Sequence, residues 1–302
     1  MDEKISVVLA VYNGEKYIIE QLESIRKQTV KVDELIVKDD GSKDNTCEIV
    51  EEYLQSHHLS QWRLIKNSQN QGWKKNFVDG LHYVSGEYIF FCDQDDIWMP
   101  QKVEKMISAM KNNKAIELLV SNYEILHMDH SKSYIEQSKH KQGATVYPYP
   151  FTNKFLHVKY PGCVYCLRRS LVEFYETYWM EVMPHDAFAW HLATVRGSLY
   201  VYNEPLIQYR RHAQTVTGRS ISNREKRIQD LEYYKQVIAL YNRYLSDYQD
   251  TKFNRAYLKQ AEQWLENREK VLEEKNVKAM LRSIKYIPYY WSFKTAIMDI
   301  LV

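Results

Sequence analysis

The sequence is poor in cysteine, and its few cysteines are not spaced for a structural metal site. Four are present, and Cys163 and Cys166 form a CVYC pair, but neither a second pair nor a histidine pair stands at zinc spacing. We interpret all four as reduced and mostly buried thiols. The pattern therefore argues against a zinc-stabilised domain.

Long hydrophobic runs are also missing. The first apolar segment begins at Ile5 behind an acidic start and is only as long as a strand, and no later segment is long enough to span a bilayer. These lengths argue against a signal peptide and against an N-terminal membrane anchor. We therefore expect a cytoplasmic protein.

A strong charge of either sign is absent as well. The 302 residues include 41 basic and 39 acidic ones, and the formal charge is +2, so no nucleic-acid partner is expected. The length suits one large domain, or one domain with an appendage, with room for an enzyme-sized cleft. The aromatic content is high at 14% and suits sugar-stacking surfaces, membrane interfaces and large cores alike.

The first part of the chain alternates segments typical of strands and helices. Residues 5–12 and 34–40 are apolar strand-like runs, and residues 15–28 between them have apolar side chains at helical spacing. Further alternation leads to a strand that ends near Cys92. We predict an α/β domain over residues 1–217, a mixed sheet flanked by helices, with ligands bound at the carboxyl ends of parallel strands.

Two later stretches of this domain are less regular. Residues 127–159 show no periodicity and predict a mobile loop over the cleft. Residues 197–212 predict a closing pair of short strands.

The remainder, residues 218–302, predicts a C-terminal helical region. Two long amphipathic segments indicate an antiparallel helical pair. The last segment combines aromatic with basic residues, and we predict either a helix packed on the α/β domain or a surface in a membrane interface. The aromatic residues of this segment are Tyr286, Tyr289, Tyr290, Trp291 and Phe293, and its basic residues are Lys278, Arg282, Lys285 and Lys294.

Polar residues follow the predicted strands at several places. The apolar run before Asp93 stops at three carboxylates, those of Asp93, Asp95 and Asp96, which repel one another unless a cation binds there. Other candidates are residues 12–15, residues 38–42, and the distant pair His185 and Asp186. If the topology is as predicted, all of them meet at one edge of the sheet.

In these motifs the chain resembles the family 2 glycosyltransferases, which are inverting enzymes of the GT-A fold that use nucleotide-sugar donors. The matching motifs are SVVLAVYNGEKYI, IVKDDGSKDNT, DQDDIWMPQKV and PHDAFAW, in family order across the first two-thirds of the chain. DQDDIW with the later QYRRHAQTVTG is similar to a branch of rhamnosyltransferases that build bacterial surface polysaccharides. The resemblance implies a GT-A fold with a C-terminal helical extension.

The resemblance implies a donor site at the first two strand ends. Ala10, Tyr12 and Asp39 would hold the base and ribose, with Asp39 accepting the imide N–H of uracil or thymine. The alternative for Asp39 and Asp40 is an ordinary DG turn. Lys75 and Asn76 fit a helix start that favours phosphate. The remaining donor-binding candidates are Glu15, Asp93, Gln94, Arg210 and Arg211.

A divalent cation, Mn²⁺ or Mg²⁺, is the implied cofactor. In the DXD triplet, Asp95 would bind the metal, and Asp93 would contact ribose or the metal shell. Asp96 could equally cap the following turn. His212 is similar to a histidine that closes over the pyrophosphate or completes the metal shell, although it could also be a surface histidine.

Asp186 stands where the family carries its general base, which removes a proton from the acceptor hydroxyl. A helix N-cap is the alternative for Asp186, and one side chain could do both. His185 and Trp190 are then acceptor-side candidates. The chain departs from the family at Lys38, where a small apolar residue is expected, and it lacks the QxxRW motif of processive synthases, which favours one sugar per encounter.

The leading hypothesis is a metal-dependent inverting hexosyltransferase. It would move one sugar from dTDP-L-rhamnose or a UDP-hexose to a polyprenyl-diphosphate-linked saccharide, at the inner face of the cell membrane, for capsule, O-antigen or cell-wall polysaccharide. One alternative is a nucleotidyltransferase, but residues 11–17 offer a single glycine where a Gly-rich phosphate loop is wanted. Others are a non-catalytic scaffold with a vestigial cleft and, less favoured, a paired-carboxylate glycosidase.

Overall fold

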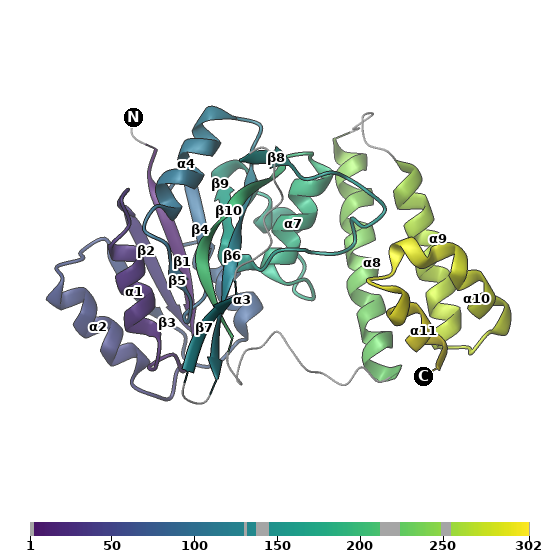
Figure 1. Ribbon diagram of the computed structural model, residues 1–302, viewed down its shortest axis with the longest axis horizontal. Coiled ribbons are helices and arrows are strands. Elements are labelled where there is room, and N and C mark those ends of the chain that lie inside the picture. Colours follow the sequence, from purple (N-terminus) through teal and green to yellow (C-terminus); the bar gives the residue numbers. More distant parts are fainter. Residues whose placement is uncertain (1–2, 130–131, 137–144, 212–223, 249–254, 302) are drawn as a thin grey trace. The chain divides into compact units, whose positions relative to one another are not determined.

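The computed structural model describes residues 3–129, 132–136, 145–211, 224–248 and 255–301 (Figure 1). The chain divides into two compact units. The first consists of Met1–Tyr149, Tyr160–Ala189 and Ser198–Val216, and the second of Pro150–Lys159, Trp190–Gly197 and Thr217–Val302. The domain boundary predicted between residues 217 and 218 falls outside the described residues and stays a prediction.

The first unit is built on one mixed β-sheet, as the sequence predicts. Its first four strands in spatial order are parallel to one another, and β9 is antiparallel to both of its neighbours. Two short strands, β7 (Lys132–Glu136) and β8 (Val146–Pro148), pair with β6 and β10. The spatial order is β3 (Trp62–Lys66), β2 (Glu34–Asp39), β1 (Ile5–Val11), β4 (Tyr88–Cys92), β9 (Tyr165–Arg168), β6 (Leu118–Asp129), β10 (Leu199–Arg211) and β5 (Ile97–Trp98).

The central strands are buried, which explains their uninterrupted apolar sequences. Every residue of β4 is buried, and all but Ala10 of β1 are. Helix α1 (Ile18–Arg26) buries Ile18, Leu22 and Ile25, which recur at helical spacing. The other helices of this unit are α2 (Thr46–Ser56), α3 (Trp73–Leu81), α4 (Lys102–Asn112), α5 (Arg169–Val172), α6 (Tyr175–Tyr178) and the start of α7 (His185–Val195), with one 3₁₀ turn, η1 (Gly162–Val164).

Two expectations about this unit are corrected. Residues 127–159 are not simply a loop, because the end of β6 and all of β7 and β8 lie within them and join the sheet. Residues 199–211 form one long strand, β10, rather than two short ones. Strand β6 pairs along most of β10, and two register shifts, between Tyr202 and Gln208, absorb the irregularity that the sequence suggested as a turn.

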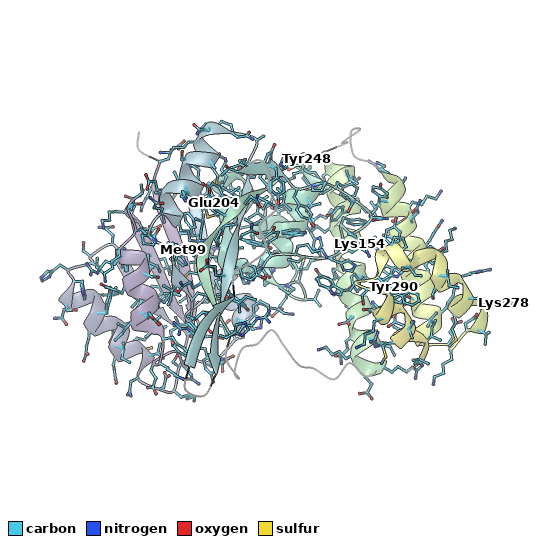
Figure 2. The ribbon with its side chains drawn as sticks, viewed as in Figure 1. Met99, Lys154, Glu204, Tyr248, Lys278 and Tyr290 are labelled. Atoms are coloured by element: carbon cyan, nitrogen blue, oxygen red, sulfur yellow. The ribbon has the colours of Figure 1, made fainter. Side chains whose placement is uncertain are left out.

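The second unit is helical. Its elements are α8 (Arg224–Asp247), α9 (Arg255–Leu272), α10 (Val277–Arg282), the 3₁₀ segment η2 (Ser283–Tyr289) and α11 (Phe293–Leu301). Helices α8 and α9 run antiparallel, as predicted, because Lys235 pairs with Glu269 whereas the later Asn242 pairs with the earlier Glu262. Figure 2 shows Tyr290 among these helices and Lys278 at their rim.

The interior of the second unit contains a charged group. Asp299 of α11 is buried and accepts hydrogen bonds from Arg227 of α8 and Arg268 of α9, the latter with an Nε–Oδ2 distance of 2.6 Å. Around it, Trp264 and Tyr290 pack edge to face with their ring centroids 5.4 Å apart. In the part of the chain that the structure describes, no helix is both long enough and apolar enough to span a membrane.

Candidate active site

The candidate site begins where β1, β2 and β4 end. These strands are adjacent and parallel, so the loops at their carboxyl ends leave the same edge of the sheet. The side chain of Gln94 joins two loops, because its Oε1 accepts from the Tyr12 N–H at 2.8 Å and its Nε2 donates to the Tyr12 carbonyl at 3.2 Å. The loop after β2 meets the same place, since the Asn13 N–H donates to Ser42 Oγ at 2.9 Å.

The predicted base-binding residues lie around this junction. Tyr12 is 41% exposed, and Ala10 at the end of β1 is partly exposed. Asp39 is buried and forms the DG turn that was the alternative to base binding, in which its Oδ2 accepts the N–H groups of Gly41 and Ser42, each at 3.0 Å. Its role toward a base stays a prediction. Glu15 contacts the start of α2, since its Oε2 accepts from the N–H of Asn45, the residue before that helix, at 3.1 Å.

A polar network behind this edge explains the unusual Lys38. Its ammonium group donates to the Asn67 side chain, and Asn67 in turn donates to Asp40 Oδ1 at 2.9 Å and to Asn76 Oδ1 at 3.0 Å. Asn76 is buried and donates to the Lys38 carbonyl at 2.7 Å, so in this structure it ties α3 to β2. Lys75, the other phosphate candidate, pairs with Asp79 on the same helix at 2.7 Å.

The acidic loop after β4 forms a compact cluster with Cys163. One oxygen each of Asp93 and Asp96 and the Cys163 sulfur all lie within 4.8 Å of one another. Burial raises the pKa of Asp93 well above its usual range, and the neighbouring carboxylates Asp96, Asp95 and Asp186 raise it further. The predicted acidic loop and the predicted general base are therefore brought together in one site.

The sequence interpretation missed two parts of this cluster. We interpreted Cys163 only as a buried thiol, yet it stands beside Asp93 and Asp96, because η1 enters β9 next to β4. Lys102 of α4 is fully buried, with its Nζ 5.1 Å from the ring centroid of Trp98, and burial lowers its pKa to about 8. A run of charged residues at the start of an amphipathic helix gave no signal that this lysine is buried.

The donors of the cluster fit a hard divalent cation. Asp96 is buried, and its Oδ1 accepts from the Arg210 N–H at 2.9 Å. Its Oδ2 has no hydrogen-bond partner within the described residues, and one oxygen of the carboxylate lies near the Cys163 sulfur. Burial raises the pKa of the Cys163 thiol well above its usual range, which keeps it protonated, so the ligand atoms on offer are carboxylate oxygens. Oxygen ligands are those that Mg²⁺ and Mn²⁺ prefer.

Asp186 is the second residue of α7. Its Oδ1 accepts from the Ala187 N–H at 2.8 Å, so it serves the first turn of the helix rather than capping it from outside. Burial raises the pKa of this carboxyl, which makes the ionised form a better proton acceptor. Gly162 packs directly against it, and a side chain at position 162 would collide with the Asp186 Cβ.

His185 and Trp190, the two acceptor-side candidates, are both buried. The His185 ring stacks on Phe77 with centroids 3.8 Å apart and meets Phe91 edge-on, and burial lowers its pKa to about 3. Trp190 is completely buried, which corrects the expectation that its indole packs beneath an acceptor sugar. The expectation for His185 rests on the motif match and that for Trp190 on its place one turn along the helix, and neither reveals which way a side chain points.

The basic candidates at the end of β10 differ from each other. Arg210 is buried, and its guanidinium donates to the Asp95 carbonyl at 2.6 Å and to Glu20 of α1, so it holds the acidic loop. Arg211 is exposed and stays a candidate for phosphate. His212 lies outside the described residues, and its predicted metal role stays a prediction.

The geometry defines an α/β protein with an acidic cluster at one edge of its sheet, and comparison with known proteins identifies its family. A family model described as "Glycosyl transferase family 2" matches residues 6–175. The chain belongs to this family of glycosyltransferases.

Two curated relatives are informative. The chain is 29% identical over 255 residues to the dTDP-rhamnosyl transferase RfbG of Shigella flexneri, covering 79% of this chain and 85% of the relative. It is 38% identical over 125 residues to WfgD of Escherichia coli, a UDP-Glc:alpha-D-GlcNAc-diphosphoundecaprenol beta-1,3-glucosyltransferase. That match covers 41% of this chain and 47% of WfgD.

Solved structures show the same fold. The crystal structure of S. aureus TarS residues 1–349 in complex with UDP-GlcNAc aligns with 98% of this chain and 81% of that one. The TM-score is 0.65 at 19% sequence identity. This similarity concerns the fold alone, which is the predicted GT-A fold.

Proposed function

We propose that the protein transfers one sugar from a nucleotide-sugar donor to a lipid-linked saccharide in bacterial surface polysaccharide synthesis, with inversion at the anomeric carbon. The relative named as a dTDP-rhamnosyl transferase spans most of the chain, which supports dTDP-L-rhamnose as the donor. A UDP-hexose is the second choice, since WfgD, matched over less than half of its length, uses UDP-Glc. Its acceptor, a diphosphoundecaprenol saccharide, supports a polyprenyl-diphosphate-linked acceptor here.

One observation carries this proposal. Gly162 packs against Asp186, and the next residue, Cys163, has its sulfur within 4.8 Å of carboxylate oxygens of Asp93 and Asp96, so the residue assigned as base lies close to the DXD loop. Sugar transfer needs this pairing, because the leaving diphosphate and the attacking hydroxyl act on opposite faces of the same carbon. A nucleotidyltransferase or a scaffold has no need for a base beside the metal carboxylates.

The acidic loop would hold the diphosphate end of the donor. Asp93, Asp95 and Asp96 are the residues that would bind Mn²⁺ or Mg²⁺, and the bound cation would supply positive charge next to the departing phosphate oxygen. Arg210 positions this loop through the Asp95 carbonyl and the Asp96 carboxylate. Tyr12 and Asp39, at the neighbouring strand ends, would receive the base.

Asp186 would act as the general base. Its carboxylate takes the proton of an acceptor hydroxyl as the bond from that oxygen to the anomeric carbon forms and the bond from that carbon to the phosphate oxygen breaks. The electron pair of the broken bond leaves with the nucleoside diphosphate. Burial, which raises the pKa of Asp186, strengthens it for this task, and its place in the first turn of α7 fixes its direction.

The test is the substitution Asp186→Asn, which keeps the size of the side chain and removes the base. We expect sugar transfer to a polyprenyl-diphosphate-linked saccharide to fall by about 10²–10⁴-fold, with metal-dependent nucleotide binding unchanged. Asp247→Asn, at the exposed end of α8, is the matched control and should transfer sugar normally. Transfer at the parental rate by Asp186→Asn would show that another group is the base.

A further inference from the structure

The end of the chain exposes an unusual number of large apolar side chains. Val277, Leu281 and Ile284 are 68%, 69% and 70% exposed, respectively. Trp291 and Phe293 are 56% and 60% exposed. Ile297, Ile300 and Leu301 are exposed as well. Single exposed apolar residues are ordinary, but a contiguous series in one short segment marks an interaction surface.

The spacing of these residues shows that they form stripes. Val277, Leu281 and Ile284 recur at intervals of four and three, and so do Phe293, Ile297 and Ile300 on α11. The opposite sides of the same elements are already packed, because Ala279, Ser283, Ala296 and Asp299 are buried. These elements therefore turn one side to the core of the second unit and an apolar side to solvent, where a water-soluble helix normally carries polar residues.

Basic residues are interleaved with the stripes. Lys278, Arg282, Lys285 and Lys294 are all exposed, and Figure 2 shows Lys278 pointing away from the helices. Residues 275–301 are all described, and the single acid among them, Asp299, is buried between two arginines. Glu273 and Glu274 precede the segment. The exposed charge of residues 275–301 is thus wholly positive.

Trp291 adds an aromatic group suited to an interface. It is more than half exposed, and Lys159, from another segment of the same unit, lies over it with Nζ 4.3 Å from the ring centroid. Indole rings beside cations are typical of the level of lipid headgroups, where one side of the ring is apolar and the other is wet.

We propose that α10, η2 and α11 form a surface, residues 277–301, that lies on an anionic membrane. The apolar stripes enter the boundary between headgroups and acyl chains, and the basic residues contact anionic headgroups. A second copy of the chain is a poorer occupant, because a two-fold contact would bring the same positive charges face to face. The role of this surface rests on the proposed function, because a lipid-linked acceptor lies in the membrane.

The rigid attachment of this surface supports the assignment. Asp299 on the buried side of α11 is paired with Arg227 of α8 and Arg268 of α9. Asn276 caps α10, accepting from the Ala279 N–H at 3.0 Å. The stripes are therefore held by a packed scaffold, and they do not need to fold when they meet the bilayer.

The test is vesicle sedimentation of the full chain, with vesicles of phosphatidylcholine alone or mixed with phosphatidylglycerol. We expect binding to the mixed vesicles that falls with added salt, and little binding to the neutral ones. Lys278→Gln with Arg282→Gln should weaken it by about fivefold for each charge. Leu281→Gln with Ile297→Gln should weaken it further still. All four side chains are exposed, so these variants should fold normally.

Matched controls lie elsewhere on the surface. Ile19→Gln changes a 52% exposed apolar residue of α1, and Lys31→Gln with Lys259→Gln removes two exposed charges. These variants should bind vesicles as the parent does. Equal binding by all variants, or no binding by the parent, would contradict the proposed membrane surface. A dimer in solution that Leu281→Gln disrupts would also contradict it, because the residues would then contact a second copy of the chain. Metal-dependent binding of dTDP or UDP without vesicles tests the proposed function separately.

Discussion

Gly162 lies against Asp186 so closely that a Cβ at position 162 would be 2.9 Å from the Cβ of Asp186 and 3.1 Å from Nε2 of His185. Burial raises the pKa of the Asp186 carboxyl, and the nearby backbone, that of Ala187 and Gly162 included, lowers it in part. The 3₁₀ turn that leads into β9 thus packs directly against Asp186.

The first prediction follows from this contact. Gly162→Ala should displace Asp186 by a few tenths of an ångström or more and lower sugar transfer about 10–100-fold, because small misplacements of a catalytic group are costly. Binding of a nucleoside diphosphate with Mn²⁺, followed by calorimetry, should stay within twofold. Unchanged transfer would mean that the neighbouring backbone gives way and that Gly162 does not position the base.

Arg210 gives the second prediction. Its guanidinium reaches the Asp95 carbonyl and Glu20 together, a fork that a lysine cannot reproduce. We expect Arg210→Lys to weaken metal-dependent nucleotide binding about tenfold, through a displaced acidic loop. Arg243→Lys, at an exposed position of α8, is the control and should bind normally. An equal loss of binding in the two variants, or none in Arg210→Lys, would show that Arg210 does not hold the acidic loop.

The third prediction concerns stability. Asp299→Ala leaves the guanidinium groups of Arg227 and Arg268 buried without their shared carboxylate, which should cost about 3–5 kcal/mol of unfolding free energy. Asp247→Ala removes an exposed carboxylate at the end of α8 and should cost far less. Urea unfolding of the full chain measures both. Equal midpoints would mean that the buried pair contributes little.

The fourth prediction is a pH dependence. Burial, aided by Lys159 and Lys154, lowers the pKa of His157 to about 4, from an ordinary value near 6.5. The unfolded chain therefore binds the proton first, so the stability from neutral His157 is complete above pH 6.5 and is lost as the pH falls toward 4. Between pH 7 and pH 5 this amounts to about 2 kcal/mol.

His157→Gln tests this dependence without removing a donor to the Tyr289 carbonyl, which His157 Nε2 meets at 3.0 Å. The glutamine does not titrate, so the loss of stability from pH 7 to pH 5 should be smaller by about 2 kcal/mol. The midpoints of urea unfolding of the parent and the variant at pH 7 and pH 5 test this prediction. An identical pH dependence in parent and variant would show that folding does not lower the pKa of His157.

The sequence predicts the sheet and the helices near the site well, because their periodicity reports burial directly. Val7 and Phe90 sit in uninterrupted apolar runs and pair in adjacent parallel strands, which suffices to place the loops after β1 and β4 at one edge. The apolar runs alone therefore predict that the motifs following these strands meet. Residues 127–159, which show no period, include the end of β6 and the short strands β7 and β8, and residues 199–211 form β10, whose pairing with β6 shifts register twice.

Side-chain contacts in the site are harder to predict from the sequence than the fold is. The spacing of the residues does not show that the His185 ring stacks on Phe77, that Trp190 is completely buried, or that the Arg210 side chain contacts the acidic loop. Those facts depend on contacts between residues far apart in the chain. Cys163 was missed for the same reason, since only the pairing of β9 with β4 brings it to Asp93 and Asp96.

The most direct test of the account is calorimetric titration of dTDP and UDP into the purified protein with Mn²⁺, repeated after chelation and with Asp95→Asn. We predict binding that requires the metal, that is lost or greatly weakened in Asp95→Asn, and that is kept in Asp186→Asn. Tighter binding of dTDP than of UDP would favour the rhamnose donor. Binding that survives chelation undiminished, or no binding of either nucleotide, would contradict the metal-dependent donor site.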